Sequence, residues 1–180
     1  ITSTITVSVN DGSSDNNFDS VADQTVSVTT TDNDVAGFTI TQTSGSTSVN
    51  ESGTTDTFTV VLNAQPASDV VIAISSGDTG EATVNSPLTF TNANWNSAQT
   101  VTVTGVDDNI IDGTVTSTLT ASIVDASSND SFDSVADQTV SVTTADNDVA
   151  GFTITQTGGS TSVSESGTTD TFTIVLNAQP

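Results

Sequence analysis

Residues 18–30 read FDSVADQTVSVTT, and residues 132–144 repeat this run without a change. The identity extends outward, because residues 1–66 align without a gap on residues 115–180 and differ at only 13 positions. The period is therefore 114 residues, which is typical of a tandem array of whole domains rather than a solenoid of short units. Because 180 residues are not a whole number of periods, we expect this sequence to be a window on a longer array.

Short runs along the chain alternate apolar residues with Thr or Ser, the period-two pattern of half-buried β-strands. They lie at 38–40, 58–60, 88–90, 101–103, 119–123 and 140–142. The continuous apolar run at 70–74 suits a central strand buried on both faces. Turn-forming residues separate the runs. The pattern predicts an all-β fold of tandem, immunoglobulin-like antiparallel β-sandwich domains, with seven strands in each 114-residue repeat.

The repeat also predicts the domain organisation. We expect residues 1–34 to be the C-terminal part of a preceding repeat, 35–148 a complete sandwich, and 149–180 the N-terminal part of a following repeat. Only Val149 and Ala150 separate Asp148 from the next predicted strand. Successive domains should therefore meet at a short, acid-lined joint instead of a flexible linker.

The charge balance excludes several classes of partner. The chain has no Lys, Arg or His against 22 Asp and Glu, a net charge of −22, and 14 of these acids fall within residues 35–148. Such a domain repels itself, and no basic side chain offsets the repulsion. Without a basic patch we expect no binding to nucleic acid or to an anionic membrane face. No apolar stretch is long enough to insert directly into a bilayer. The missing partner is a cation from solution.

The composition also argues against catalysis. Without Cys there is no disulfide or thiolate site, and without His there is no Ser–His–Asp triad. Zinc or copper would need an all-carboxylate site, which these metals do not favour. A paired-carboxylate hydrolase needs a cleft, and nothing in the sequence indicates one. We therefore expect that the protein is not an enzyme.

Half of the acids in one repeat gather in four short segments: Glu51, Asp78, Asp107, Asp108, Asp112, Asp146 and Asp148. A sandwich places alternate turns at the same end, so these carboxylates should converge at one pole. Converging like charges repel unless a counter-ion lies between them. Calcium suits the position because it takes about six to eight oxygen ligands in flexible geometry. Glu81 competes with Asp78 for the same role. The remaining acids favour solvated turns or faces: Asp11, Asp56, Asp69, Asp125, Asp130, Asp133 and Asp137.

The order and spacing of these segments resemble the Calx-β domain, the calcium-binding sandwich of sodium–calcium exchangers and of many giant bacterial surface proteins. The resemblance covers the whole repeat and rests on Glu51, Asp78, the run DDNIID at 107–112 and the boundary DNDVAGF at 146–152. The phrase LTFTNANWNSAQTVTVTGVDD at 88–108 is similar to the bacterial branch.

The resemblance implies a set of Ca²⁺ ligands. They are the side chains of Glu51, Asp78, Asp107, Asp108, Asp112, Asp146 and Asp148, with the carbonyl of Ile110 and with Asn147 where the exchangers carry a further Asp. The same positions in the partial copies are Asp32, Asn33, Asp34 and Glu165. A late acidic ligand is replaced near Val115, which implies fewer ions than in the exchangers, on the order of one to three.

The repeat and the resemblance together predict a structural repeat of a secreted, extracellular filament or adhesin stalk, of the kind found in biofilms. Calcium at the interdomain joints would stiffen it. Its partners would be neighbouring copies joined head to tail, with any surface or glycan target held by a head domain outside this window. Two alternatives remain open: the subunit of a fibre assembled by strand exchange or lateral β-pairing, and an accessory module of a large extracellular enzyme. Trp95 is expected to pack against the core rather than bind sugars.

Overall fold

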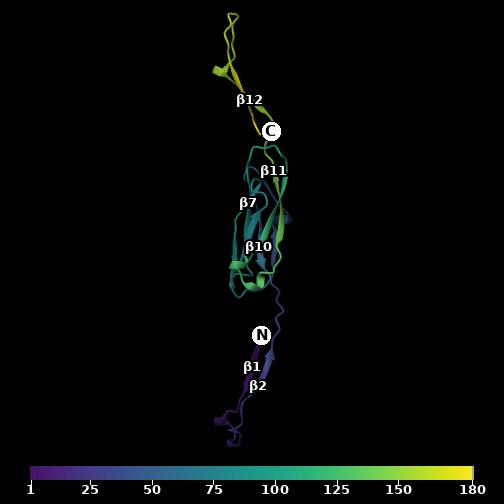
Figure 1. Cartoon of the computed structure of the whole chain (residues 1–180), viewed down its shortest axis with the longest axis vertical. Helices are drawn as coiled ribbons and strands as arrows, with labels where there is room; N and C mark the ends of the chain where they lie inside the picture. Colours follow the sequence, from purple (N-terminus) through teal and green to yellow (C-terminus); the bar gives the residue numbers. More distant parts are fainter. Residues whose placement is uncertain (180) are drawn as a thin grey trace. The chain divides into compact units, whose positions relative to one another are not determined.

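The computed structural model describes residues 1–179, which form strands, turns and short 3-10 helices, with no α-helix among them. The chain divides into two units, Ile1–Val35 and Ala36–Pro180, and each is described by itself. Figure 1 follows the strands along the chain. No helix within the described range is long and apolar enough to cross a membrane. The strands and 3-10 helices of residues 1–179 confirm the all-β prediction.

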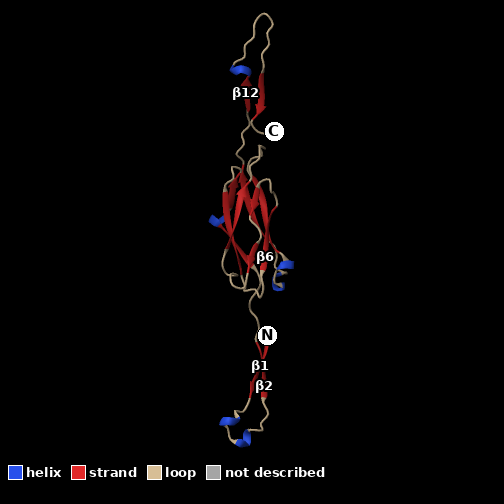
Figure 2. Cartoon of the chain, turned by 90° about the vertical axis from the view of Figure 1, so that its left-hand side faces the viewer, coloured by secondary structure: helices blue, strands red, loops and turns tan. Residues whose placement is uncertain are grey.

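Nine strands of the second unit form a sandwich of two sheets, drawn in red in Figure 2. One sheet has the order β4-β11-β10-β6-β8, with the bounds Thr47–Asn50, Gln138–Ala145, Val115–Ile123, Val70–Ser76 and Leu88–Phe90. The other has the order β3-β5-β9-β7, with the bounds Phe38–Gln42, Thr55–Leu62, Gln99–Gly105 and Ala82–Val84. Neighbouring strands are antiparallel except β4 and β11, which run parallel.

The core lies between the two sheets and is made by the alternating residues of the strands. In β9 the side chains of Val101 and Val103 are fully buried, while Thr102 between them points to the other face. Phe58 and Phe90 are also fully buried, and removing each such side chain from water contributes about 2 kcal/mol. Trp95 is partly buried and packs against this core, which confirms the expectation for it.

Two details of the sequence prediction were wrong. Nine strands form where seven were predicted, because the short strands β4 and β7, of 4 and 3 residues, carry only Val49 and the pair Ala82 and Val84 as apolar residues. In β6 the residues Val70, Ile72 and Ile74 are buried, but Val71 and Ala73 are only half-buried. A two-layer sandwich covers one face of each sheet, so this strand is not buried on both faces.

Outside the sandwich the structure describes two hairpins. β1 (Thr2–Val7) pairs with β2 (Gln24–Thr29) in the first unit, and β12 (Phe152–Gln156) pairs with β13 (Phe172–Leu176) in the second. The 3-10 helices are η1 (Asp11–Ser13), η2 (Asn16–Phe18), η3 (Thr43–Gly45), η4 (Asp125–Ser127), η5 (Asp130–Phe132) and η6 (Thr157–Gly159). All strands of the sandwich fall inside 35–148. The boundaries 1–34, 35–148 and 149–180 stay a prediction, and Pro180 lies outside the described residues.

Candidate metal centre

The register of two strand pairs brings acidic residues together at one end of the sandwich. In the parallel pair of β4 and β11, Asn50 lies opposite Ala145, so both strands end together and continue into Glu51 and Asp146. The N–H of Glu51 donates to the carbonyl of Ala145 at 3.1 Å.

In the antiparallel pair of β7 and β9, Ala82 lies opposite Gly105. Glu81, just before β7, is therefore beside the first residue of the loop 106–114, which we call the acid loop. The N–H of Val106 donates to the carbonyl of Glu81 at 2.9 Å. The acid loop carries Asp107, Asp108 and Asp112, and it reaches β10 next to β11. Pairing between strands thus fixes where these carboxylates meet.

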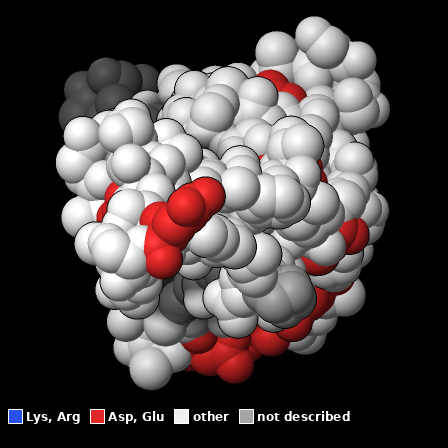
Figure 3. All heavy atoms as spheres, turned by 90° about the horizontal axis from the view of Figure 1, so that it is seen from above, with Lys and Arg blue, Asp and Glu red and all other residues white. Residues whose placement is uncertain are grey.

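Two groups of three carboxylates result. Glu51, Glu81 and Asp112 form the first acid group, and Glu51, Asp146 and Asp148 form the second; within each group the carboxylate oxygens lie within 4.8 Å of one another. Glu51 belongs to both groups and is only 1% exposed, and Glu81 is 6% exposed. Figure 3 shows acidic side chains at the surface without any Lys or Arg beside them. No basic side chain in the sequence can neutralise these groups.

Neutral N–H groups hold several of the carboxylates in place. The main-chain N–H of Asn147 donates to Glu51 Oε2 at 3.0 Å, and the Asn147 side-chain amide donates to Asp107 Oδ1 at 2.9 Å. Asp146 accepts from the N–H of Gly113 at 2.9 Å and from the N–H of Asp148 at 2.6 Å. These bonds connect the acid loop to the segment that follows β11, and they orient the carboxylates without supplying a positive charge.

Some of the buried oxygens in these groups have no partner. Among the described residues, three buried side-chain oxygens make no hydrogen bond: Glu81 Oε2, Asp148 Oδ2 and Ser117 Oγ. The first two belong to the acid groups. Leaving a buried polar atom such as Glu81 Oε2 unsatisfied costs about 1–3 kcal/mol, and more when the group is charged. A buried carboxylate oxygen that faces other carboxylates and lacks a donor is suited to a cation.

The pKa values reflect the crowding. For Glu51, the N–H of Asn147 lowers the pKa, but burial and the charges of Asp146, Asp108 and Asp112 outweigh it and the net shift is upward. Burial, together with the charges of Asp112 and other nearby acids, raises the pKa of Glu81.

The two acids after β11 shift in opposite directions. Burial and the charge of Asp146 raise the pKa of Asp148. The N–H groups of Asp148 and Gly113 lower the pKa of Asp146. One member of the second acid group is therefore fixed in its charged form, while its neighbours resist ionisation. A divalent cation would remove this conflict.

The structure brings together most, but not all, of the residues singled out from the sequence. Glu51, Asp112, Asp146 and Asp148 are in the acid groups, and Asp107 is tied to them through Asn147. The charge of Asp108 contributes to the raised pKa values of both buried glutamates, while its Oδ1 accepts the N–H of Ile110 at 2.7 Å. Ile110 itself lies at the tip of the acid loop, in a single bridge to Gln179.

Asp78 lies outside both acid groups. It is exposed, and its Oδ1 accepts the N–H of Gly80 at 3.0 Å, as in an Asx-turn. Glu81, three residues later, occupies the position at the acid loop instead, because it directly precedes β7. Sequence reasoning could name both residues but not choose between them, since the choice depends on the register of β7 against β9.

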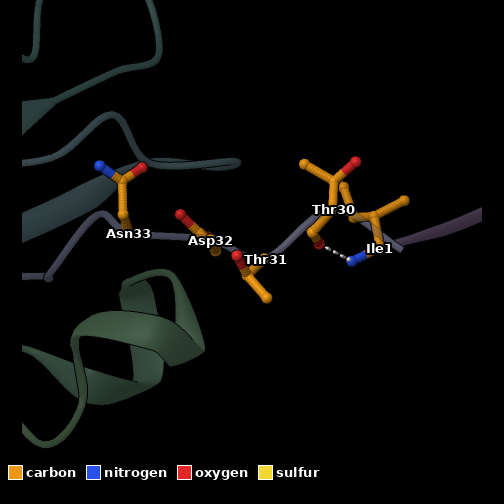
Figure 4. A pocket seen from close by; sticks show the side chains of 5 residues that line it. All are labelled: Ile1, Thr30, Thr31, Asp32 and Asn33. Atoms are coloured by element: carbon orange, nitrogen blue, oxygen red, sulfur yellow. Dashed lines mark hydrogen bonds between the residues drawn. The ribbon is translucent and has the colours of Figure 1, made fainter. Parts of the chain in front are cut away.

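The equivalent positions in the partial copies are exposed. Asp34 donates its N–H to Asp32 Oδ1 at 3.0 Å, as Asp148 does to Asp146. Figure 4 shows Asp32 and Asn33 beside Ile1 and Thr30, lining an open depression together with Thr31. Glu165 belongs to no acid group among residues 1–179.

Other acids behave as expected of solvated positions, with one exception. Asp69, Asp125, Asp130 and Asp137 are exposed. Asp56 has a local structural role, because its carboxylate accepts the N–H of Ser48 at 2.9 Å across the turn between β4 and β5. The donor set of the acid groups is thus oxygen only, and it fits a hard divalent cation such as Ca²⁺.

No protein family and no curated protein matches the sequence. Among solved structures, the chain is similar to the apo-form Calx CBD1 domain, with 12% identity and a TM-score of 0.43, covering 62% of this chain and 98% of the other. Domains 1–6 of the surface layer protein SbsC match with 20% identity and a TM-score of 0.45, covering 88% of this chain and 24% of the other. SSP-19, an MSP-domain protein like family member in Caenorhabditis elegans, matches with 18% identity and a TM-score of 0.37, covering 56% of this chain and 92% of the other.

Proposed function

We propose that this chain is a structural repeat of a secreted, extracellular filament or adhesin stalk, and that Ca²⁺ bound by the acid groups stiffens it. Glu51, Glu81 and Asp112 would hold one ion, and Glu51, Asp146 and Asp148 would hold another or share it. The ion would supply positive charge between carboxylates that otherwise repel. Its partners would be neighbouring copies of the repeat.

The observation that carries the proposal is the buried Glu81 Oε2. It has no hydrogen-bond partner, and its group shares a 4.8 Å neighbourhood with Glu51 and Asp112. Asp and Glu are common in turns without any metal. A glutamate that is 6% exposed, faces two further carboxylates and has no donor is not explained by turn chemistry.

The charge of the whole chain supports a cation that binds only in the folded state. With a net charge of −22, compact packing brings negative charges together. A cation that binds the assembled groups but not the unfolded chain adds its binding free energy to the stability. A chain that is loose where free calcium is scarce and firm where calcium is abundant would suit export to a cell surface.

The test is a calcium titration of the full chain after removal of metal, followed by calorimetry and thermal unfolding. We expect saturable binding and a melting temperature that rises with calcium concentration. At about 100 times the dissociation constant, one site adds about 2.7 kcal/mol to the free energy of unfolding. Asp125→Asn, at an exposed acid, serves as the matched control. Absence of binding at millimolar calcium, or equal melting in calcium and in EDTA, would overturn the proposal.

A specific observation favours a second candidate, the subunit of a fibre. The two hairpins expose apolar side chains whose counterparts one period away are buried in the sandwich. Phe152 is 61% exposed while Phe38 is 3% exposed, and Phe18 is 58% exposed while Phe132 is 2% exposed. Strand exchange between chains would cover these faces.

Mass measurements distinguish the two candidates. A filament assembled from exchanged strands dissociates to the mass of single chains in denaturant, whereas a covalent array keeps its full mass. If the chain stays monomeric at high concentration under native conditions, in calcium and without it, the fibre candidate fails.

A further inference from the structure

The acid loop makes one contact that neither the sandwich nor the acid groups require. Its tip residue Ile110 forms an isolated parallel bridge with Gln179, and the N–H of Gln179 donates to the carbonyl of Asn109. Gln179 follows β13 and belongs to the stretch predicted to begin the next repeat. The contact therefore joins the main chain of the acid loop to the main chain beyond the sandwich.

The same loop is held at its other points by the acid groups. Asp112 belongs to the first acid group, and Gly113 donates its N–H to Asp146. Near the start of the loop, Asp107 accepts from the side chain of Asn147. The loop carries three carboxylates and no cation, so its path without a counter-ion is opposed by repulsion. A counter-ion that neutralises the acid groups would therefore also hold the tip of the acid loop, at Ile110, in place.

The central copy shows that the contact is available to a finished sandwich. Gln179 belongs to the sequence Asn-Ala-Gln-Pro, which occurs one period earlier at residues 63–66. There Ala64 and Pro66 are buried in the sandwich, but Gln65 is exposed. No hydrogen bond within residues 1–179 uses the main-chain N–H of Gln65. A complete repeat thus presents an unused N–H donor, Gln65, at the position equivalent to Gln179, whose N–H donates to the acid loop.

We propose that the acid loop is a cation-dependent docking surface for the next copy of the repeat, which it binds through the main chain at the position of Gln179. The proposal rests on the proposed cation-binding role of the acid groups. When the ion holds the loop, Asn109 and Ile110 form a short edge that pairs with the next repeat. Without the ion, the loop is repelled from the acid groups and the edge is lost. The partner is a second copy of this repeat in the same chain.

A disulfide cross-link tests the docking directly, because the sequence contains no Cys that could interfere. Residues paired across neighbouring strands lie within the Cα separation that a disulfide spans, about 4.4–6.8 Å. In the full chain, Ile110→Cys combined with Gln179→Cys should form an intramolecular disulfide about tenfold faster in calcium than after chelation. The control pair, Ile110→Cys with Ser162→Cys, places the second thiol beyond the far end of the hairpin and should show no such acceleration.

Calcium binding, measured on the same reduced variants, separates the possible failures. If calcium binds with unchanged affinity but does not change the cross-linking rate, the docking proposal is overturned while the proposed function stands. If no calcium binds, both are overturned.

A second variant needs no cross-link. Gln179→Pro removes the donor N–H and leaves every residue of the acid groups in place. In the unchanged chain, docking should make the β12–β13 hairpin less mobile when calcium is added, as measured by backbone NMR relaxation. Gln179→Pro should bind calcium equally well but should not show this reduction in mobility. Retention of that ordering in Gln179→Pro would refute docking through this N–H.

Discussion

Replacing Glu81 with glutamine should have opposite effects on the ion-free and the calcium-bound protein. The amide has nearly the shape of the carboxyl but carries no charge, and its NH₂ can donate to the carboxylates of Glu51 and Asp112. In the ion-free protein the substitution removes two repulsions and gives the buried position a donor. In the calcium-bound protein it removes one ligand charge.

The size of the first effect follows from the geometry. Two unit charges no more than 4.8 Å apart repel by at least about 3.5 kcal/mol at an effective dielectric constant of about 20, so Glu81 faces about 7 kcal/mol from its two neighbours. Proton uptake limits this penalty. The ordinary pKa of a glutamate carboxyl is 4.5, so keeping it protonated at about pH 7.5 costs about 4 kcal/mol of free energy. Because Glu81 can take up a proton at this lower cost, the repulsion cannot destabilise the protein by more than the cost of protonation. Glu81→Gln should therefore stabilise the ion-free protein by no more than about 4 kcal/mol.

The assay is thermal unfolding of matched samples in EDTA and in saturating calcium, with calorimetric titration of the folded protein. For a domain of this size 1 kcal/mol corresponds to about 4 °C, so the ion-free melting temperature should rise by several degrees. Calcium affinity should fall at least about tenfold, which is about 1.4 kcal/mol. Asp125→Asn should change neither quantity. A Glu81→Gln protein that is less stable without calcium, or that binds calcium as tightly as before, would refute the reasoning.

Three further predictions concern the same end of the sandwich. Asp108→Asn should weaken calcium binding more than Asp125→Asn, because the charge of Asp108 reaches both buried glutamates; equal titration curves would show that the acid loop is not involved. The pKa values of Glu51 and Glu81 are raised in the folded protein, so their contribution to the free energy of unfolding is full at low pH. This contribution is lost as the pH rises through the folded-state pKa of each residue. The melting temperature of the metal-free protein should therefore rise as pH falls from about 7.5 to about 5, while in calcium it should fall because protons compete with the ion; the same slope in both conditions would contradict this. Gly105→Ala should destabilise the sandwich by about 3 kcal/mol in urea unfolding, because its Cβ would lie 2.1 Å from the carbonyl oxygen of Asn50; an unchanged midpoint would show that the β4–β5 turn can move away.

The long strands of this sandwich could be predicted from the sequence, because each alternates apolar residues with Thr or Ser. Val101 and Val103 are both predicted and observed in the core. The short strands β4 and β7 could not be predicted in this way, although β8, which also has three residues, could. β7 has only Ala82 and Val84 as apolar residues, and its existence depends on pairing with β9. β8 has the same length and alternation as β7, but its apolar residues Leu88 and Phe90 are larger, so its local pattern is the clearer of the two.

The candidate site divides along the same line. Residues that directly follow a long strand or close a repeat, such as Asp146 and Asp148, could be identified from their spacing. The choice of Glu81 over Asp78 could not, because it depends on where β7 begins and on its pairing with β9, which places the residue just before Ala82 beside the acid loop. Likewise, the bridge between Ile110 and Gln179 joins main-chain atoms and leaves no signal in the side chains.

The parallel pairing of β4 with β11 has a mechanical consequence. Once β3 has been pulled from β5, a pull along the polypeptide reaches β4 at its first residue and β11 at its last, so the hydrogen bonds between Thr47–Asn50 and Val142–Ala145 are loaded in shear and must break together. Peeling them one at a time would need less force. Glu51 and Asp146 lie just past the end of this pair, where a bound cation would act as a clamp against sliding. We therefore expect the force needed to unfold a single repeat, measured by pulling one molecule, to increase with calcium.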